Sequence, residues 1–93
     1  MSMKPATVWT PADIISVIRE LAESGLFPAH LLDGEISDRD SIDALGIDSI
    51  GGVYLIDRLE ELTGVAMPDD FAPPGSDLSD IADRVNQIVA ENS

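Results

Sequence analysis

The chain has 93 residues and no cysteine, a length typical of one small domain that buries only about 60 to 65 per cent of its unfolded surface. Eighteen Asp and Glu against five Lys and Arg give a formal net charge of −13, which repels nucleic-acid phosphates and attracts basic protein surfaces. With 44% hydrophobic but 4% aromatic residues, the composition favours helices over a β-sandwich. The short length disfavours a large catalytic cleft, and the absence of cysteine excludes a disulfide framework and a Cys-type zinc site.

The N-terminal segment, residues 1–9, is predicted to be flexible. It has a single Lys and no apolar run of the length that a signal peptide or a membrane span requires. The expectation is a cytoplasmic protein that does not enter a membrane.

The first predicted helix covers residues 11–24. Thr10 is a good cap, and Asp13 stands where a capping box has its acidic partner. Apolar residues recur at helical spacing on one face: Ile14, Ile15, Ile18, Leu21 and Ala22. Gly25 ends the helix. Three charged residues are expected to face solvent: Arg19, Glu20 and Glu23.

A long loop is predicted over residues 26–47, where short apolar groups alternate with Pro28, Gly34 and a run of Asp and Ser. Loops of this length in compact domains are usually functional or supported by local turns, and Ser41 is suited to begin such a turn. The loop carboxylates do not fit an EF-hand begun at Asp33, because its sixth position is Asp38 instead of Gly and its twelfth is Ala44 instead of Glu. No metal site is expected.

A second helix is predicted to begin at Asp48 or Ser49 and to end at Gly64. Its helical projection gives a core side made of Gly52, Leu55, Ile56, Leu59 and Leu62. Gly51 and Gly52 each lower helix stability by roughly 1 kcal/mol relative to alanine, so we expect the missing side chains to serve a purpose.

The last part of the chain predicts one short and one long helix. Residues 67–71 fit a single turn that places Phe71 in the core. Asp77 and Asp80 form a cap for the final helix, whose apolar stripe is Leu78, Ile81, Ala82, Val85, Ile88 and Val89. The fold class is therefore all-α, a small four-helix bundle with three longer helices, one short helix and a long first loop.

The segment Gly46-Ile47-Asp48-Ser49-Ile50 places a hydroxyl where the long loop meets the second helix. An isolated Asp-Ser pair is most often an ordinary helix cap. A hydrolase elbow needs Gly-x-Ser-x-Gly, but Ile47 stands two residues before Ser49, and His30 is the one histidine available as a base. An enzyme is therefore not expected, and His30 is interpreted as a surface residue.

At this motif the sequence resembles the acyl carrier protein family. The family's attachment motif is Gly-x-Asp-Ser-Leu, and the chain departs from it at Ile50. The resemblance continues through residues 59–65, residues 67–69 and the capped final helix, and it spans residues 10–89. The chain is thus interpreted as a carrier protein domain over residues 10–91.

The resemblance implies that Ser49, preceded by Asp48, receives 4'-phosphopantetheine from coenzyme A through a phosphopantetheinyl transferase. The arm would carry an acyl or aminoacyl group as a thioester. The implied partners are a loading ligase or transferase, a ketosynthase and other enzymes of a fatty-acid-like, polyketide or nonribosomal pathway, and the carrier is expected to be monomeric.

Basic surfaces of these partners are expected to dock on the second helix, at Ile50, Val53, Tyr54, Asp57, Glu60 and Glu61. Many fatty-acid carriers have acidic residues where this chain has Gly51 and Tyr54, which favours a specialised pathway. The alternative is an unmodified acidic helical module that binds other proteins.

Overall fold

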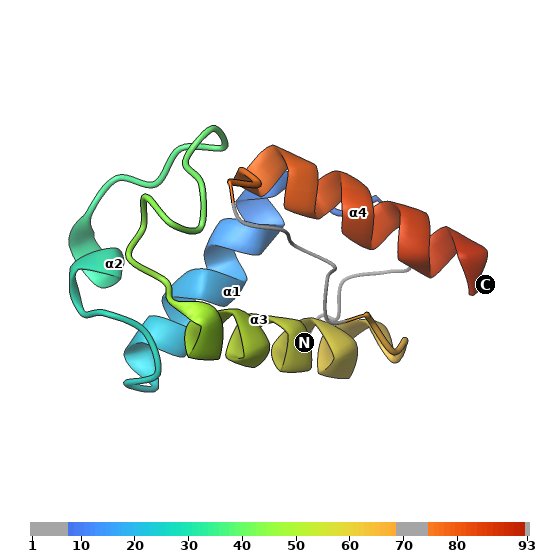
Figure 1. Ribbon diagram of the computed structural model, residues 1–93, viewed down its shortest axis with the longest axis horizontal. Helices are drawn as coiled ribbons and strands as arrows, with labels where there is room; N and C mark the ends of the chain where they lie inside the picture. Colours follow the sequence, from blue (N-terminus) through green and yellow to red (C-terminus); the bar gives the residue numbers. More distant parts are fainter. Residues whose placement is uncertain (1–7, 69–74, 93) are drawn as a thin grey trace.

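The computed structural model describes residues 8–68 and 75–92, and these residues form four helices and no strand (Figure 1). The helices are α1 (Pro11–Glu23), α2 (His30–Asp33), α3 (Ser49–Thr63) and α4 (Leu78–Glu91). Helix α1 packs against each of the other three, so it is the centre of the bundle. The predicted all-α bundle is confirmed. The short helix α2 lies within the first loop, whereas the turn predicted at residues 67–71 falls mostly outside the described residues.

Local signals fix the start and end of α1 as predicted. The Thr10 side chain accepts a hydrogen bond from the Asp13 N–H, and the Asp13 carboxylate accepts one from the Thr10 N–H, which satisfies two donors of the first turn. After Ser24 the chain leaves the helix at Gly25, whose φ of 84° is a left-handed conformation that glycine tolerates.

The buried side of α1 differs from the prediction at two positions. Val17 is buried and Ile15 is only half-buried. The buried residues of this helix are Ile14, Val17, Ile18, Leu21 and Ala22. The core stripe therefore contains Val17, which sequence reasoning missed.

Arg19, which the sequence predicted to face solvent, is half-buried and holds the first loop. Its guanidinium donates hydrogen bonds to three backbone carbonyls at the end of α2, those of Leu31 (3.0 Å), Leu32 (2.9 Å) and Gly34 (3.1 Å). These carbonyls have no partner within so short a helix. Arg19 therefore fastens α2 and the loop to α1.

The first loop is also joined to the start of α4. Three backbone hydrogen bonds make this connection: Ile42 N to Ser76 O (3.3 Å), Leu78 N to Asp40 O (3.2 Å) and Ser79 N to Asp38 O (3.1 Å). The Ser41 hydroxyl accepts a hydrogen bond from the Ala44 N–H (3.1 Å), which confirms the turn predicted there. The loop is therefore ordered by contacts on both sides.

Trp9 belongs to the segment predicted to be flexible, yet it packs into the core with 8% of its surface exposed. The backbone N–H of Trp9 donates to the Asn86 side-chain oxygen (2.6 Å), and the backbone carbonyl of Trp9 accepts from the Asn86 side-chain amide (2.9 Å). Trp9 thereby joins the chain before α1 to the middle of α4.

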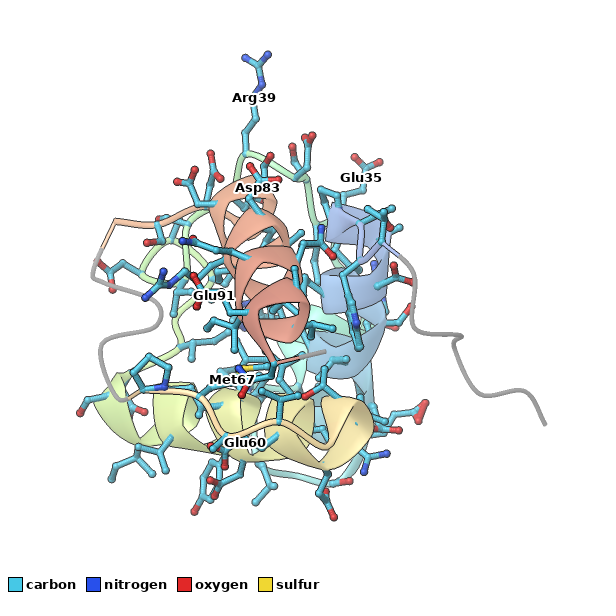
Figure 2. All side chains as sticks on the ribbon, turned by 90° about the vertical axis from the view of Figure 1, so that its right-hand side faces the viewer. Glu35, Arg39, Glu60, Met67, Asp83 and Glu91 are labelled. Atoms are coloured by element: carbon cyan, nitrogen blue, oxygen red, sulfur yellow. The ribbon has the colours of Figure 1, made fainter. Side chains whose placement is uncertain are left out.

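Helix α4 closes the core against α1. Asp77 and Asp80 form the capping box predicted for its start. Met67, which is buried, lies between α3 and α4 (Figure 2). None of the helices in residues 8–68 and 75–92 combines the length and apolar character that a bilayer crossing requires.

Candidate functional site

The Asp48-Ser49 pair lies where the first loop ends and α3 begins. Asp48 is the N-cap, and its carboxylate accepts a hydrogen bond from the Gly51 N–H at 2.8 Å. Two residues before Asp48, Gly46 adopts a φ of 81°, which a residue with a side chain rarely adopts. Ser49 is the first residue of the helix and is exposed. The turn at Gly46 and the Asp48 cap thus fix the backbone that presents the serine.

The Ser49 side chain is exposed and has open surroundings among the described residues. Within residues 8–68 and 75–92, no hydrogen bond involves this hydroxyl or the backbone N–H groups of Ser49 and Ile50. Open N–H groups and the positive end of the helix dipole favour an anionic group at this position. A phosphodiester on the serine oxygen therefore suits the arrangement.

Gly51 explains how the loop holds the start of α3. A Cβ at Gly51 would lie 2.7 Å from Ile47 Cγ2 and 3.3 Å from Phe27 Cε1. Both neighbours are buried, Ile47 with 4% and Phe27 with 5% of their surface exposed. The missing side chain therefore allows the loop to pack directly on the helix backbone, two residues after Ser49. Sequence reasoning did not identify Phe27, and the glycine was the one signal of a close approach.

The buried side of α3 is rotated from the predicted one. It comprises Gly51, Leu55 and Leu59. Gly52 is half-buried instead of core, and Leu62, predicted to be core, is 42% exposed. The buried side is the one that contains Gly51, where the loop packs on the helix.

Two of the predicted docking residues are strongly exposed. Ile50 is 61% and Val53 is 54% exposed. Tyr54, expected to dock partners and hence to be exposed, is instead half-buried and packs against the core, at the edge of the buried side of α3. Asp57 is exposed, and no hydrogen bond or ion pair engages it within the described residues.

The two acidic residues near the end of α3 are engaged within the protein. Glu60 is half-buried and accepts a hydrogen bond from the Met67 N–H at 2.7 Å. Glu61 pairs with Arg58 at 3.0 Å. The Glu61 side chain remains 70% exposed beside Arg58, whereas the Glu60 carboxylate is held by the backbone of Met67.

Arg58 also connects α3 to α1 through Glu20. Its hydrogen bonds hold the pKa of the Glu20 carboxyl below its ordinary value, and the Glu20 and Glu61 carboxylates raise the pKa of Arg58. Nothing in the sequence pattern linked Arg58 to Glu20, because the two belong to different helices. The guanidinium of Arg58 therefore joins α3 to α1.

The acidic first loop shows no arrangement suited to a metal. Within the described residues, no group of three or more His, Cys, Asp or Glu side chains is placed to hold an ion. His30 is exposed, as expected. Arg39 projects from the loop at the opposite end of the molecule from α3 (Figure 2).

Comparison with known proteins gives a family that fits this geometry. A family model described as the phosphopantetheine attachment site matches residues 29–85, a range that includes most of the first loop, all of α3 and the first half of α4. Neither the curated proteins nor the solved structures gave a match. The residues at the start of α3 suit the group that this family carries, since an exposed hydroxyl lies beside open backbone donors. The chain therefore belongs to the phosphopantetheine attachment site family and is a carrier protein for covalently attached 4'-phosphopantetheine.

Proposed function

We propose that Ser49 is the residue that carries the phosphopantetheine and that the chain delivers an acyl or aminoacyl thioester to partner enzymes. The observation that carries this proposal is the exposed Ser49 hydroxyl at the first position of α3, inside the matched range. The partners catalyse the loading and transfer reactions, and the carrier supplies position and recognition.

Attachment requires the Ser49 oxygen to bond to the phosphorus of the phosphopantetheinyl group of coenzyme A. The adenosine bisphosphate part leaves, and the hydroxyl proton passes to a base on the transferase. Asp48 is not suited to be that base, because its carboxylate already caps the helix through the Gly51 N–H. Its role is to hold the start of α3, while the N–H groups of Ser49 and Ile50 face the new phosphodiester.

The partner enzymes are proposed to dock on the exposed side of α3, each through an apolar surface of its own that is surrounded by basic residues. The exposed side chains of Ile50 and Val53 would meet the apolar part of the partner's surface, and the exposed carboxylate of Asp57 would meet its basic residues. Glu60 contributes less than the sequence suggested, because it is half-buried and accepts the Met67 N–H, whereas the exposed Glu61 adds to the acidic side of the surface. Gly51 and Tyr54 stand where many fatty-acid carriers have acidic residues, which favours a dedicated polyketide, nonribosomal or aminoacyl pathway.

Incubation with coenzyme A, magnesium and a broad-specificity phosphopantetheinyl transferase, followed by intact mass measurement, tests the proposal. Wild-type protein should gain the mass of one phosphopantetheine group, and Ser49→Ala should gain none while melting within a few degrees of wild type. Modification of Ser49→Ala would move the site elsewhere. No modification of the wild type would favour an unmodified interaction module. The mass of the protein isolated from its own cells would identify the carried group.

A further inference from the structure

Two neighbouring residues of α1 fasten different parts of the chain. Arg19 donates hydrogen bonds of 2.9 to 3.1 Å to three carbonyls at the end of α2. Glu20, the next residue, pairs with Arg58 of α3. Successive side chains of a helix point about 100° apart, so α1 holds α2 in one direction and α3 in another. The chain between these two anchors, residues 35–57, contains Ser49.

Helix α2 lies beside the turn that leads to Ser49. A Cβ at Gly46 would stand 3.7 Å from His30 Cε1 of α2, and α2 and the start of α3 occupy the same end of the molecule (Figure 1). The backbone N–H groups of Gly46 and Ile47 close the turn through hydrogen bonds of 3.0 and 3.2 Å. The position of α2 therefore bears on the direction in which the chain enters α3, three residues before Ser49.

Helix α2 has little stability of its own. It has four residues, and helices shorter than about 12 to 15 residues are marginal in water without tertiary contacts. The tertiary contacts of α2 include the buried side chain of Leu31 and the guanidinium of Arg19. Hydrogen bonds from a charged donor are roughly twice as strong as those between neutral groups. Arg19 therefore provides much of what holds α2 in place.

Building on the proposed attachment at Ser49, we propose that Arg19 is a positioning residue for that reaction. It holds α2 beside the turn at Gly46 and so keeps the serine in the orientation that a transferase uses. Without the Arg19 bonds, α2 and the turn adopt several arrangements, while the pair of Glu20 and Arg58 still holds α3. The apparent affinity of an enzyme that needs one arrangement falls in proportion to the population of that arrangement. The loss therefore appears in KM, and kcat is unchanged because the same complex forms once the enzyme has bound.

The test breaks the Arg19 bonds and measures both the reaction and the turn. Arg19→Met keeps an unbranched side chain without donors, and Arg19→Gln is too short to reach the same carbonyls. Each should raise the KM of a broad-specificity phosphopantetheinyl transferase for the carrier by about three- to tenfold, with kcat unchanged. The amides of Gly46 and Ile47 should lose more protection from deuterium exchange than those of Leu55 and Leu59 in α3.

Two further variants provide a rescue and a matched control. Arg19→Lys keeps the charge and three donors on one nitrogen, so it serves the carbonyls of Leu31 and Leu32, which one nitrogen of Arg19 binds in the wild type. Its KM should lie between those of wild type and Arg19→Met. Arg84→Gln is the control, because Arg84 is also half-buried but bonds to Gln87 of its own helix, α4. Its KM should equal that of wild type.

Three results would overturn the inference while leaving the proposed function intact. A wild-type KM for Arg19→Met and Arg19→Gln would show that Ser49 needs no support from α2. An equal loss of protection in the turn and in α3 would show that Arg19 stabilises the fold as a whole. A fall in kcat with unchanged KM would contradict the population argument. If the wild type accepted no phosphopantetheine, the proposed function itself would be refuted, and the inference would fail with it.

Discussion

Alanine at Gly51 should strain the contact between the first loop and α3. Its Cβ would stand 2.7 Å from Ile47 Cγ2, about 1 Å closer than ordinary van der Waals contact. Ile47 and Phe27 are buried and have little room to move, and such overpacking costs about 1 to 3 kcal/mol. Alanine also gains about 1 kcal/mol of helix propensity, so the net effect ranges from neutral to a loss of about 2 kcal/mol.

Gly52→Ala separates these two contributions, because it has the same gain in propensity without a neighbour within 4 Å. The difference in unfolding free energy between the two variants therefore measures the clash itself, about 1 to 3 kcal/mol. Thermal and urea unfolding, followed by far-UV circular dichroism, should place Gly51→Ala at least about 4 °C below Gly52→Ala. Coincident transitions for the two variants would refute the close packing of Ile47 and Phe27 on the helix.

Leu59→Ala should lose about 2 to 5 kcal/mol in urea unfolding, because Leu59 is fully buried; a loss below 1 kcal/mol would contradict its place in the core. Glu60→Ala should lose about 1 kcal/mol, because the Met67 N–H loses its acceptor, and an unchanged Tm would show that this bond contributes nothing. The lowered pKa of Glu20 gives stability that is present above its ordinary value of 4.5 and is lost as the pH falls through the lowered pKa. Since the pair is partly exposed, this contribution is small, and Arg58→Gln should remove it, which unfolding curves at neutral and acidic pH would measure.

The helices could be predicted because their signals are local. Thr10 with Asp13 and Asp77 with Asp80 are capping boxes, each specified by two residues three positions apart. Gly64 ends α3 in a left-handed conformation, as a C-terminal glycine should. The motif at Ser49 was equally local, so its place at the start of α3 followed directly.

The errors arose where contacts join residues far apart in the sequence. The sequence predicted that Arg19 faces solvent, because its contact with the carbonyls at the end of α2 joins segments that are far apart in the sequence. The projection of α3 chose Gly52 over Gly51 for the core, because it could not include the approach of Phe27. Glu60 looked like surface charge because its partner, the Met67 N–H, is a backbone group that no pattern reveals. Tertiary packing decided each case.

The hydrogen bonds between the first loop and α4 also bear on how the region around Ser49 opens. The Ile42 amide is protected by the Ser76 carbonyl, so it should exchange with solvent deuterium at the pace of α4 and not at that of a loop. Pairing between segments so distant in sequence costs loop-closure entropy and slows folding. The loop that leads to Ser49 thus shares a cooperative unit with a helix that follows it, and loosening the start of α4 should release the serine's surroundings as well.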